Sequence, residues 1–200
     1  LYKGDQTARG VKFNYTIKKA VKEEMGLIDV DYSIDLSTEA SVDWAVDKGF
    51  TKFADMTLDS NVKPGVRLTY KPYIETKEWT KYRNMLYVIS IDGRIVKIGM
   101  TTTGLSKRWG SYNNGTPEIR EGKGSGSTTN YNVVQPLKIA IEEGRNVEWY
   151  CWAPPVKTYT NEAWGYTEEV QAKDPEWYEN LLLTMYEEEF GKKPHLSSNK

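Results

Sequence analysis

Four side chains in the middle of the chain have the chemistry to hold a phosphate group. Tyr87 and Lys97 flank a turn signal at Asp92-Gly93, so they can lie near each other across an antiparallel hairpin. Arg108 and Tyr112 are four residues apart and share one face of a helix. Arginine is the usual residue for gripping phosphate. On pattern alone, a structural tyrosine with surface cations remains an equally simple interpretation.

Glu179 is a carboxylate on the inward side of the last predicted helix. The apolar side of that helix is formed by Tyr178, Leu182, Met185 and Tyr186, and Glu179 falls inside the same arc. An inward carboxylate is costly unless it is paired or bound to a metal. The pattern therefore predicts either a metal ligand or a boundary glutamate bridged to a cation.

These residues need a hairpin and two helices to bring them together. The sequence predicts an α+β chain, with an Asp174-Pro175 start and a Gly191 stop for the last helix. A loop rich in Thr and Tyr is expected after Pro154-Pro155. We expect helices at 11–26, 39–47, 104–112, 132–143 and 176–190, and strands at 66–70, 85–90, 94–100 and 146–153.

The scarcity of cysteine and histidine excludes several kinds of site. Cys151 is the only cysteine and His195 the only histidine, which argues against an internal disulfide, a cysteine-based zinc site and a Ser-His-Asp triad. The net charge of −1 lacks the basic excess that nucleic-acid-binding proteins usually carry. Any contact with DNA must therefore use local basic patches.

The distribution of apolar residues predicts no membrane segment. No apolar run is long enough to span a bilayer, and no apolar stretch follows the lysine at the start to form a signal peptide. We therefore expect a cytoplasmic protein.

The motifs around the hairpin resemble those of the GIY-YIG nuclease superfamily. Met85-Leu86-Tyr87 and Lys97-Ile98-Gly99 match its paired motifs in spacing, although the first lacks Gly and the second lacks Tyr. Arg108 matches the family arginine on the following helix, and Glu179 matches its metal-binding glutamate.

The resemblance covers residues 83–193 and is closest to the restriction-endonuclease branch, which can carry Lys at the position of Lys97. It implies a core at 81–200 with a three-stranded antiparallel sheet flanked by helices. Residues 1–80 lie outside the resemblance, and we expect them to form an N-terminal α/β extension for DNA recognition or dimerisation. The family often has an Asn after the final helix, for which Asn199 is the only candidate.

The same resemblance implies a magnesium-dependent mechanism, in which Mn²⁺ may replace Mg²⁺. Glu179 would hold the metal together with the scissile phosphate and waters. Tyr87 would act as general base, with its pKa lowered by Lys97 and the metal. Arg108 would stabilise charge on the phosphate, and Tyr112 would position the phosphate or the water.

A second group of residues is predicted to contact DNA. It consists of polar and basic side chains in the Gly/Ser/Thr-rich loop at 116–130 and on the preceding helix, for which a flexible connector is the alternative. The predicted contacts are Lys107, Arg120, Lys123, Thr128, Thr129 and Asn130.

The function implied by the resemblance is that of a type II restriction endonuclease cutting double-stranded DNA at a short sequence. Cutting both strands of a palindrome favours a homodimer, and such an enzyme is expected to have a cognate DNA methyltransferase. The alternatives are a phage or mobile-element endonuclease that nicks DNA, and a catalytically inactive DNA-binding protein on the same fold.

Overall fold

The computed structural model describes residues 32–59, 67–75, 77, 81–113 and 128–197. Its centre is one five-stranded antiparallel sheet with the strand order β2-β1-β5-β3-β4. The strands are β1 (Thr51–Asp59), β2 (Arg67–Pro72), β3 (Met85–Ile91), β4 (Arg94–Thr101) and β5 (Val147–Trp152). The α+β prediction is confirmed, but the sheet has five strands rather than three. The two additional strands, β1 and β2, come from the region N-terminal to residue 81 and pair with β5 through β1.

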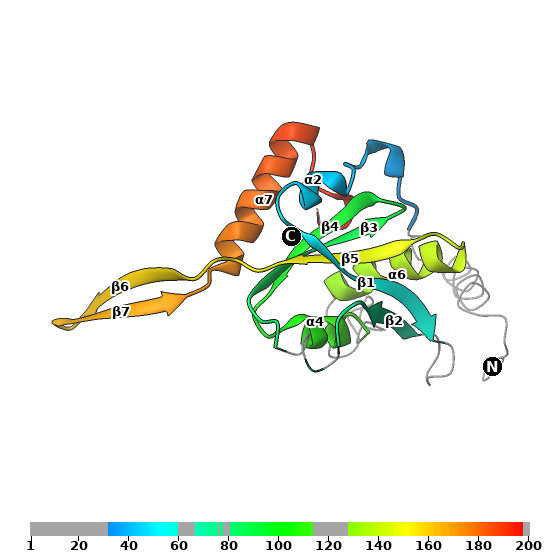
Figure 1. The fold of residues 1–200 in the computed structure, drawn as a ribbon. Helices are drawn as coiled ribbons and strands as arrows, with labels where there is room; N and C mark the ends of the chain where they lie inside the picture. Colours follow the sequence, from blue (N-terminus) through cyan, green and yellow to red (C-terminus); the bar gives the residue numbers. More distant parts are fainter. Residues whose placement is uncertain (1–31, 60–66, 76, 78–80, 114–127, 198–200) are drawn as a thin grey trace, which may run out of the picture.

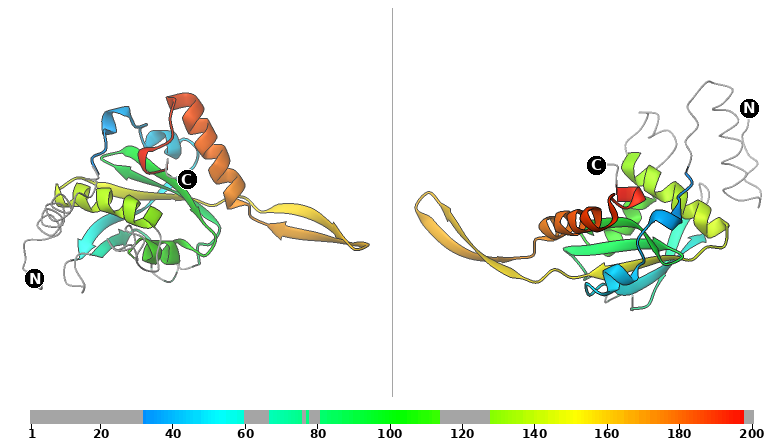
Figure 2. Two further views of the ribbon diagram at one scale, coloured as in Figure 1. Left: turned by 180° about the vertical axis from the view of Figure 1, so that it is seen from behind. Right: turned by 90° about the horizontal axis from the view of Figure 1, so that it is seen from above.

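Helices cover both faces of this sheet (Figure 1, Figure 2). One face packs against α4 (Leu105–Tyr112) and α6 (Thr128–Glu142). The other face packs against α2 (Asp43–Val46) and α7 (Pro175–Phe190). Short 3₁₀ turns, η1 (Leu36–Thr38) and η2 (His195–Ser197), flank these elements. No helix within the described ranges is long and apolar enough to cross a bilayer.

The predicted central elements are confirmed with small shifts of their ends. β3, β4, β5 and α7 start and end within about a residue of prediction, and Asp174 caps α7 by accepting a hydrogen bond from the Trp177 amide. α6 begins four residues earlier than predicted, at Thr128. The helix expected at 39–47 is shorter than predicted and covers only α2, Asp43–Val46. It ends before Gly49, whose backbone is left-handed. The helix predicted at 11–26 lies outside the described residues.

The prediction of a loop after Pro154-Pro155 is wrong. The chain instead forms an antiparallel hairpin of β6 (Lys157–Ala163) and β7 (Tyr166–Ala172). This hairpin, the arm, is a separate two-stranded sheet that projects from the body between β5 and α7 (Figure 1, Figure 2). Its polar strands lack the continuous apolar face by which a strand is usually recognised.

The outer edge of β4 is covered by segments from distant parts of the chain. Ile95 donates its amide hydrogen to the carbonyl of Ala40 at 2.9 Å. Further along, the Ser197 hydroxyl accepts from the Ile98 amide at 2.8 Å and donates to the Ile98 carbonyl at 3.1 Å. These contacts satisfy backbone groups that an edge strand otherwise exposes.

Candidate active site

Tyr87 on β3 is the centre of a buried polar cluster. Its ring is completely buried and packs edge-on against Trp149, with ring centroids 5.5 Å apart. Its hydroxyl lies 2.5 Å from the hydroxyl of Tyr112 and accepts a hydrogen bond from Nε of Arg108 at 2.9 Å. The structure therefore brings together three of the five predicted catalytic residues by direct contact.

Gly99 makes room for this tyrosine. Tyr87 is paired with Gly99 on the neighbouring strand β4, and a methyl group at Gly99 would overlap the Cζ and hydroxyl atoms of the Tyr87 ring. Since β4 is the outermost strand, the ring lies over the edge strand of the sheet, with its hydroxyl next to Gly99. The glycine of the second motif thus has a steric role that spacing alone did not reveal.

Replacing Gly99 with alanine is expected to lower the free energy of unfolding by about 1–3 kcal/mol, the usual cost of overpacking a core. The new methyl would lie 2.9 Å from Cε2 of Tyr87 and closer still to Cζ, so the ring must leave its present position. Urea denaturation measures the change. Gly110→Ala is the matched control, because a methyl there meets nothing within 4 Å. Equal stability of the two variants would contradict the assigned role of Gly99.

Burial and hydrogen bonding set the ionisation of the two phenols. Burial raises the pKa of Tyr87, and the charge of Arg108 and the hydrogen bonds from Tyr112 and Arg108 oppose this rise. The pKa of Tyr87 is thus raised rather than lowered as predicted, because burial outweighs the opposing groups, of which Arg108 has the largest effect. The pKa of Tyr112 is raised well above its usual value, first by burial and then by the charge of Tyr87. Nε of Arg108 donates directly to the Tyr87 hydroxyl, so the guanidinium is placed to stabilise a negative charge on that oxygen.

Helix α4 positions Arg108 and Tyr112 through its contacts with the sheet and α6. The side chain of Asn113, directly after Tyr112, accepts from the Leu68 amide at 3.0 Å and donates to the Leu68 carbonyl at 2.8 Å. Asn113 itself keeps a right-handed helical conformation. This contact with β2 could not be predicted from local spacing, because it joins two residues 45 positions apart.

Glu179 and Lys97 are the two buried charged members of the predicted set. Glu179 is only 4% exposed and Lys97 only 5%. Lys97 precedes Gly99 by two residues on β4, so it leaves the strand on the same face as Tyr87. Helix α7 packs on the other face of the sheet, yet the negative charge of Glu179 acts on Tyr87 and raises its pKa. The carboxylate thus lies within electrostatic reach of the phenol.

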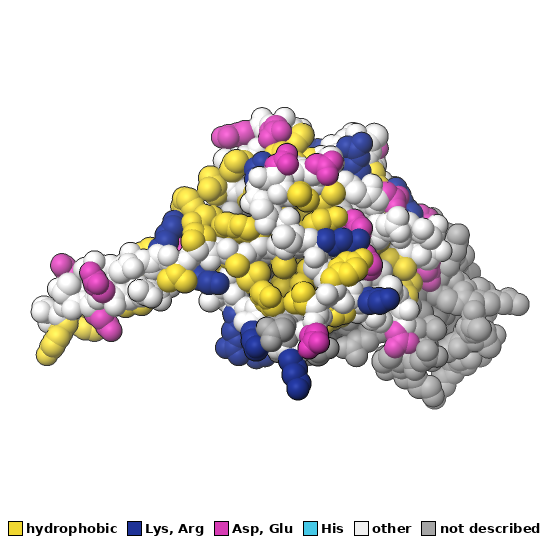
Figure 3. All heavy atoms as spheres, viewed as in Figure 1, with side chains coloured by type: hydrophobic (Ala, Val, Ile, Leu, Met, Phe, Trp, Pro, Cys, Tyr) yellow, Lys and Arg dark blue, Asp and Glu magenta, His cyan; other side chains and the backbone are white. Residues whose placement is uncertain are grey.

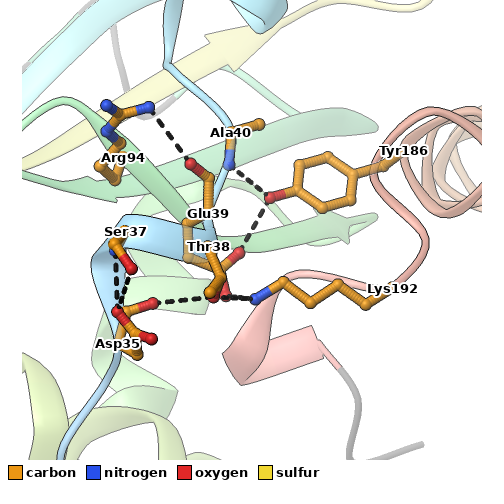
Figure 4. Close-up of polar contacts among 8 residues, drawn as sticks. All are labelled: Asp35, Ser37, Thr38, Glu39, Ala40, Arg94, Tyr186 and Lys192. Atoms are coloured by element: carbon orange, nitrogen blue, oxygen red, sulfur yellow. Dashed lines mark hydrogen bonds and ion pairs between the residues drawn. The ribbon is translucent and has the colours of Figure 1, made fainter.

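A second polar network fixes α7 and with it Glu179 (Figure 4). The buried carboxylate of Glu39 accepts from the Tyr186 hydroxyl at 2.9 Å and pairs with Nζ of Lys192 at 2.6 Å. The Tyr186 hydroxyl also accepts from the Ala40 amide at 2.9 Å. The end of α7 is therefore tied to the segment that covers the start of β4.

The predicted DNA contacts fall in different environments. Lys107 on α4 and Thr129 on α6 are exposed. Asn130 is buried and donates to the Ser111 carbonyl at 3.0 Å, which joins α6 to α4. Thr128 is the first residue of α6. Arg120, Lys123 and Asn199 lie outside the described residues.

Comparisons with known proteins place this arrangement among nuclease folds. No protein-family model matches the chain, and no curated protein matches it. The solved structure of restriction endonuclease HPY188I in complex with product DNA is 26% identical with a TM-score of 0.53, covering 87% of this chain and 98% of that one. A mutant of bacteriophage T4 EndoII is 22% identical with a TM-score of 0.50, covering 72% and 92%. The chain therefore has a restriction-endonuclease-like α+β fold.

Proposed function

We propose that the chain is a DNA endonuclease of the GIY-YIG type, with Tyr87 as the general base. The observation that carries the proposal is the hydroxyl of Tyr87, which meets a phenol and a guanidinium over the edge strand within electrostatic reach of Glu179. The likeness to restriction endonuclease HPY188I over nearly the whole of that chain supports the same activity here.

In this mechanism the ionised hydroxyl of Tyr87 takes a proton from the attacking water. The phenolate that results from its ionisation is stabilised by the hydrogen bonds from Tyr112 and from Nε of Arg108. Arg108 is only partly buried, so its guanidinium can also grip a phosphate oxygen. The substrate phosphate then enters on the Arg108 side of the cluster.

The residues present fit a single magnesium ion held by one carboxylate. Glu179 is a buried carboxylate near the general base, and Mg²⁺ commonly takes one or two carboxylates with phosphate and waters as its other ligands. Among the described residues, no three His, Cys, Asp or Glu side chains gather into a closed metal cage. When bound, the ion supplies positive charge that stabilises the phosphate and the leaving oxygen. Lys97 adds a second positive charge on the Tyr87 face.

The proposed substrate is double-stranded DNA with a short recognition sequence, as for a type II restriction enzyme. This extends the activity named for restriction endonuclease HPY188I to the present chain. Such an enzyme would act as a two-fold dimer with one site per protomer and would be accompanied by a methyltransferase that protects host DNA.

Plasmid cleavage tests the proposal directly. The protein is incubated with supercoiled plasmid in Mg²⁺, in Mn²⁺ and in EDTA. Discrete linear fragments formed only with a divalent cation are expected. Nicked circles without linear product would instead favour a nicking endonuclease, and uncut DNA that still shifts on a gel would favour an inactive DNA-binding protein.

A further inference from the structure

The arm carries a conspicuous exposed aromatic tip. Trp164 is 97% exposed and Tyr166 is 81% exposed. The tip is the part of the arm furthest from the body in both side views (Figure 1, Figure 2). Because aromatic side chains carry large apolar surface, leaving two of them in water is unfavourable unless something covers them.

The backbone conformation at the tip of the arm is also unfavourable for a tryptophan. Trp164 has φ 52° and Gly165 has φ 83°, as in a two-residue hairpin turn with left-handed backbone at both positions. Asparagine is the usual residue at the first of these positions, whereas a bulky side chain there is strained. A strained and exposed tryptophan is typical of a side chain kept for recognition.

The arm has two unlike faces. The strand register places the apolar residues Tyr159, Ala163, Tyr166 and Val170 on one face, together with Lys157, Asn161 and Glu168, whereas the other face carries only polar and acidic side chains. A two-stranded ribbon is marginally stable in water by itself. The face with Tyr159 and Tyr166 is therefore suited to pack against another surface.

A matching surface lies on the body, over α7 and β5. A largely apolar hollow of about 190 Å³ is lined by Phe50, Trp152, Tyr178, Leu181 and Met185, with Lys48 among its lining residues. Cavities of about 150 Å³ hold a benzene ring, so this hollow has room for an aromatic side chain. Hydrophobic side chains gather along α7 toward the base of the arm (Figure 3).

The charge of the arm indicates which kind of partner it binds. The arm carries one lysine, Lys157, against three glutamates, Glu162, Glu168 and Glu169. The resulting net negative charge of the arm is repelled by the phosphates of DNA. It is attracted by a cation such as Lys48, which lines the hollow.

We propose that the arm is a dimerisation element, whose tip places Trp164 in the α7 hollow of a second copy of this chain. A two-fold axis lets both arms and both hollows be used at once, as in an isologous interface. The inference rests on the arm and the hollow and not on the cleavage chemistry.

Sedimentation equilibrium over a concentration series tests this interface. Trp164→Asn removes the indole but keeps a residue that suits the turn, so the arm itself is retained. It is expected to weaken the dimer by at least about 30-fold, as for an interface hot spot. Thr160→Ala, on the polar face of the arm, is the matched control and should dimerise as the parent does.

Mixing two variants gives a sharper test. Leu181→Glu places a negative charge in the hollow and should also prevent dimerisation. A mixture of Trp164→Asn and Leu181→Glu chains retains one intact arm and one intact hollow, so heterodimers should reappear. A parent chain that stays monomeric, or a Trp164→Asn variant with the parent's mass distribution, would overturn the proposal. So would a variant that loses only DNA affinity.

Discussion

Replacing Glu179 with glutamine is expected to lower the rate of Mg²⁺-dependent DNA cleavage by at least about a thousandfold, because metal stabilisation of the transition state contributes several kcal/mol. The substitution keeps the size of the side chain and removes the charge that would hold the ion. Glutamine is neutral and Glu179 is almost fully buried, so the fold should be retained. Single-turnover cleavage and a gel shift in EDTA measure the two effects separately.

Glu188→Gln provides the control on the same helix. Glu188 is exposed on α7, so its loss should change neither cleavage nor DNA binding. The metal assignment would be wrong if Glu179→Gln cut DNA as fast as Glu188→Gln. A Glu179→Gln protein that no longer shifts DNA would indicate a structural role for the carboxylate instead.

Removing the hydroxyl of Tyr87 with Tyr87→Phe is expected to lower cleavage by about 100- to 10,000-fold, the usual contribution of a general base. It also leaves the partners Arg108 and Tyr112 with one hydrogen bond fewer, which costs about 1–3 kcal/mol of stability. The pH dependence of cleavage is the decisive measurement. Because burial raises the pKa of Tyr87, the active phenolate is a minor form near neutrality and its fraction grows with pH. The rate should rise about tenfold per pH unit between neutrality and this pKa in the parent and be flat in Tyr87→Phe.

Tyr186→Phe separates catalysis from burial. Tyr186 is also a buried tyrosine whose hydroxyl bridges two groups, the Ala40 amide and the Glu39 carboxylate. Its loss should reduce stability but preserve the rise of the cleavage rate with pH. A Tyr87→Phe variant that keeps the parent's pH profile would assign the proton transfer to another group.

The elements around the candidate site were predictable because local signals agree with tertiary packing. Asp92-Gly93 fixes the β3–β4 hairpin, and Asp174, Pro175 and Gly191 mark the ends of α7. The position of Glu179 within an apolar helix face correctly indicated its burial. These signals depend on residues close in sequence, where spacing determines which side chains share a face.

The features that the sequence did not reveal depend on distant contacts. β1 is buried mainly through its pairing with β5, and its outer residues show no alternation that marks a strand. β6 and β7 are mutually paired and almost wholly exposed, and polar residues such as Asn161 and Glu168 interrupt the face that carries their tyrosines, so neither strand shows a clear apolar alternation. The raised pKa of Tyr87 was also missed, because it follows from complete burial rather than from the neighbouring charges that the sequence suggested.

The covering of β4 by Ser197 has a consequence for protein synthesis. Ser197 follows Ile98 by 99 residues, and translation adds about 5–20 residues per second. Ser197 is therefore synthesised roughly 5–20 seconds after Ile98. During this time the edge of β4 beside Lys97 and Gly99 lacks the hydrogen bonds from Ser197. A nascent chain interrupted after α7 would leave this strand uncovered beside Tyr87, so assembly of the proposed active site requires translation through residue 197.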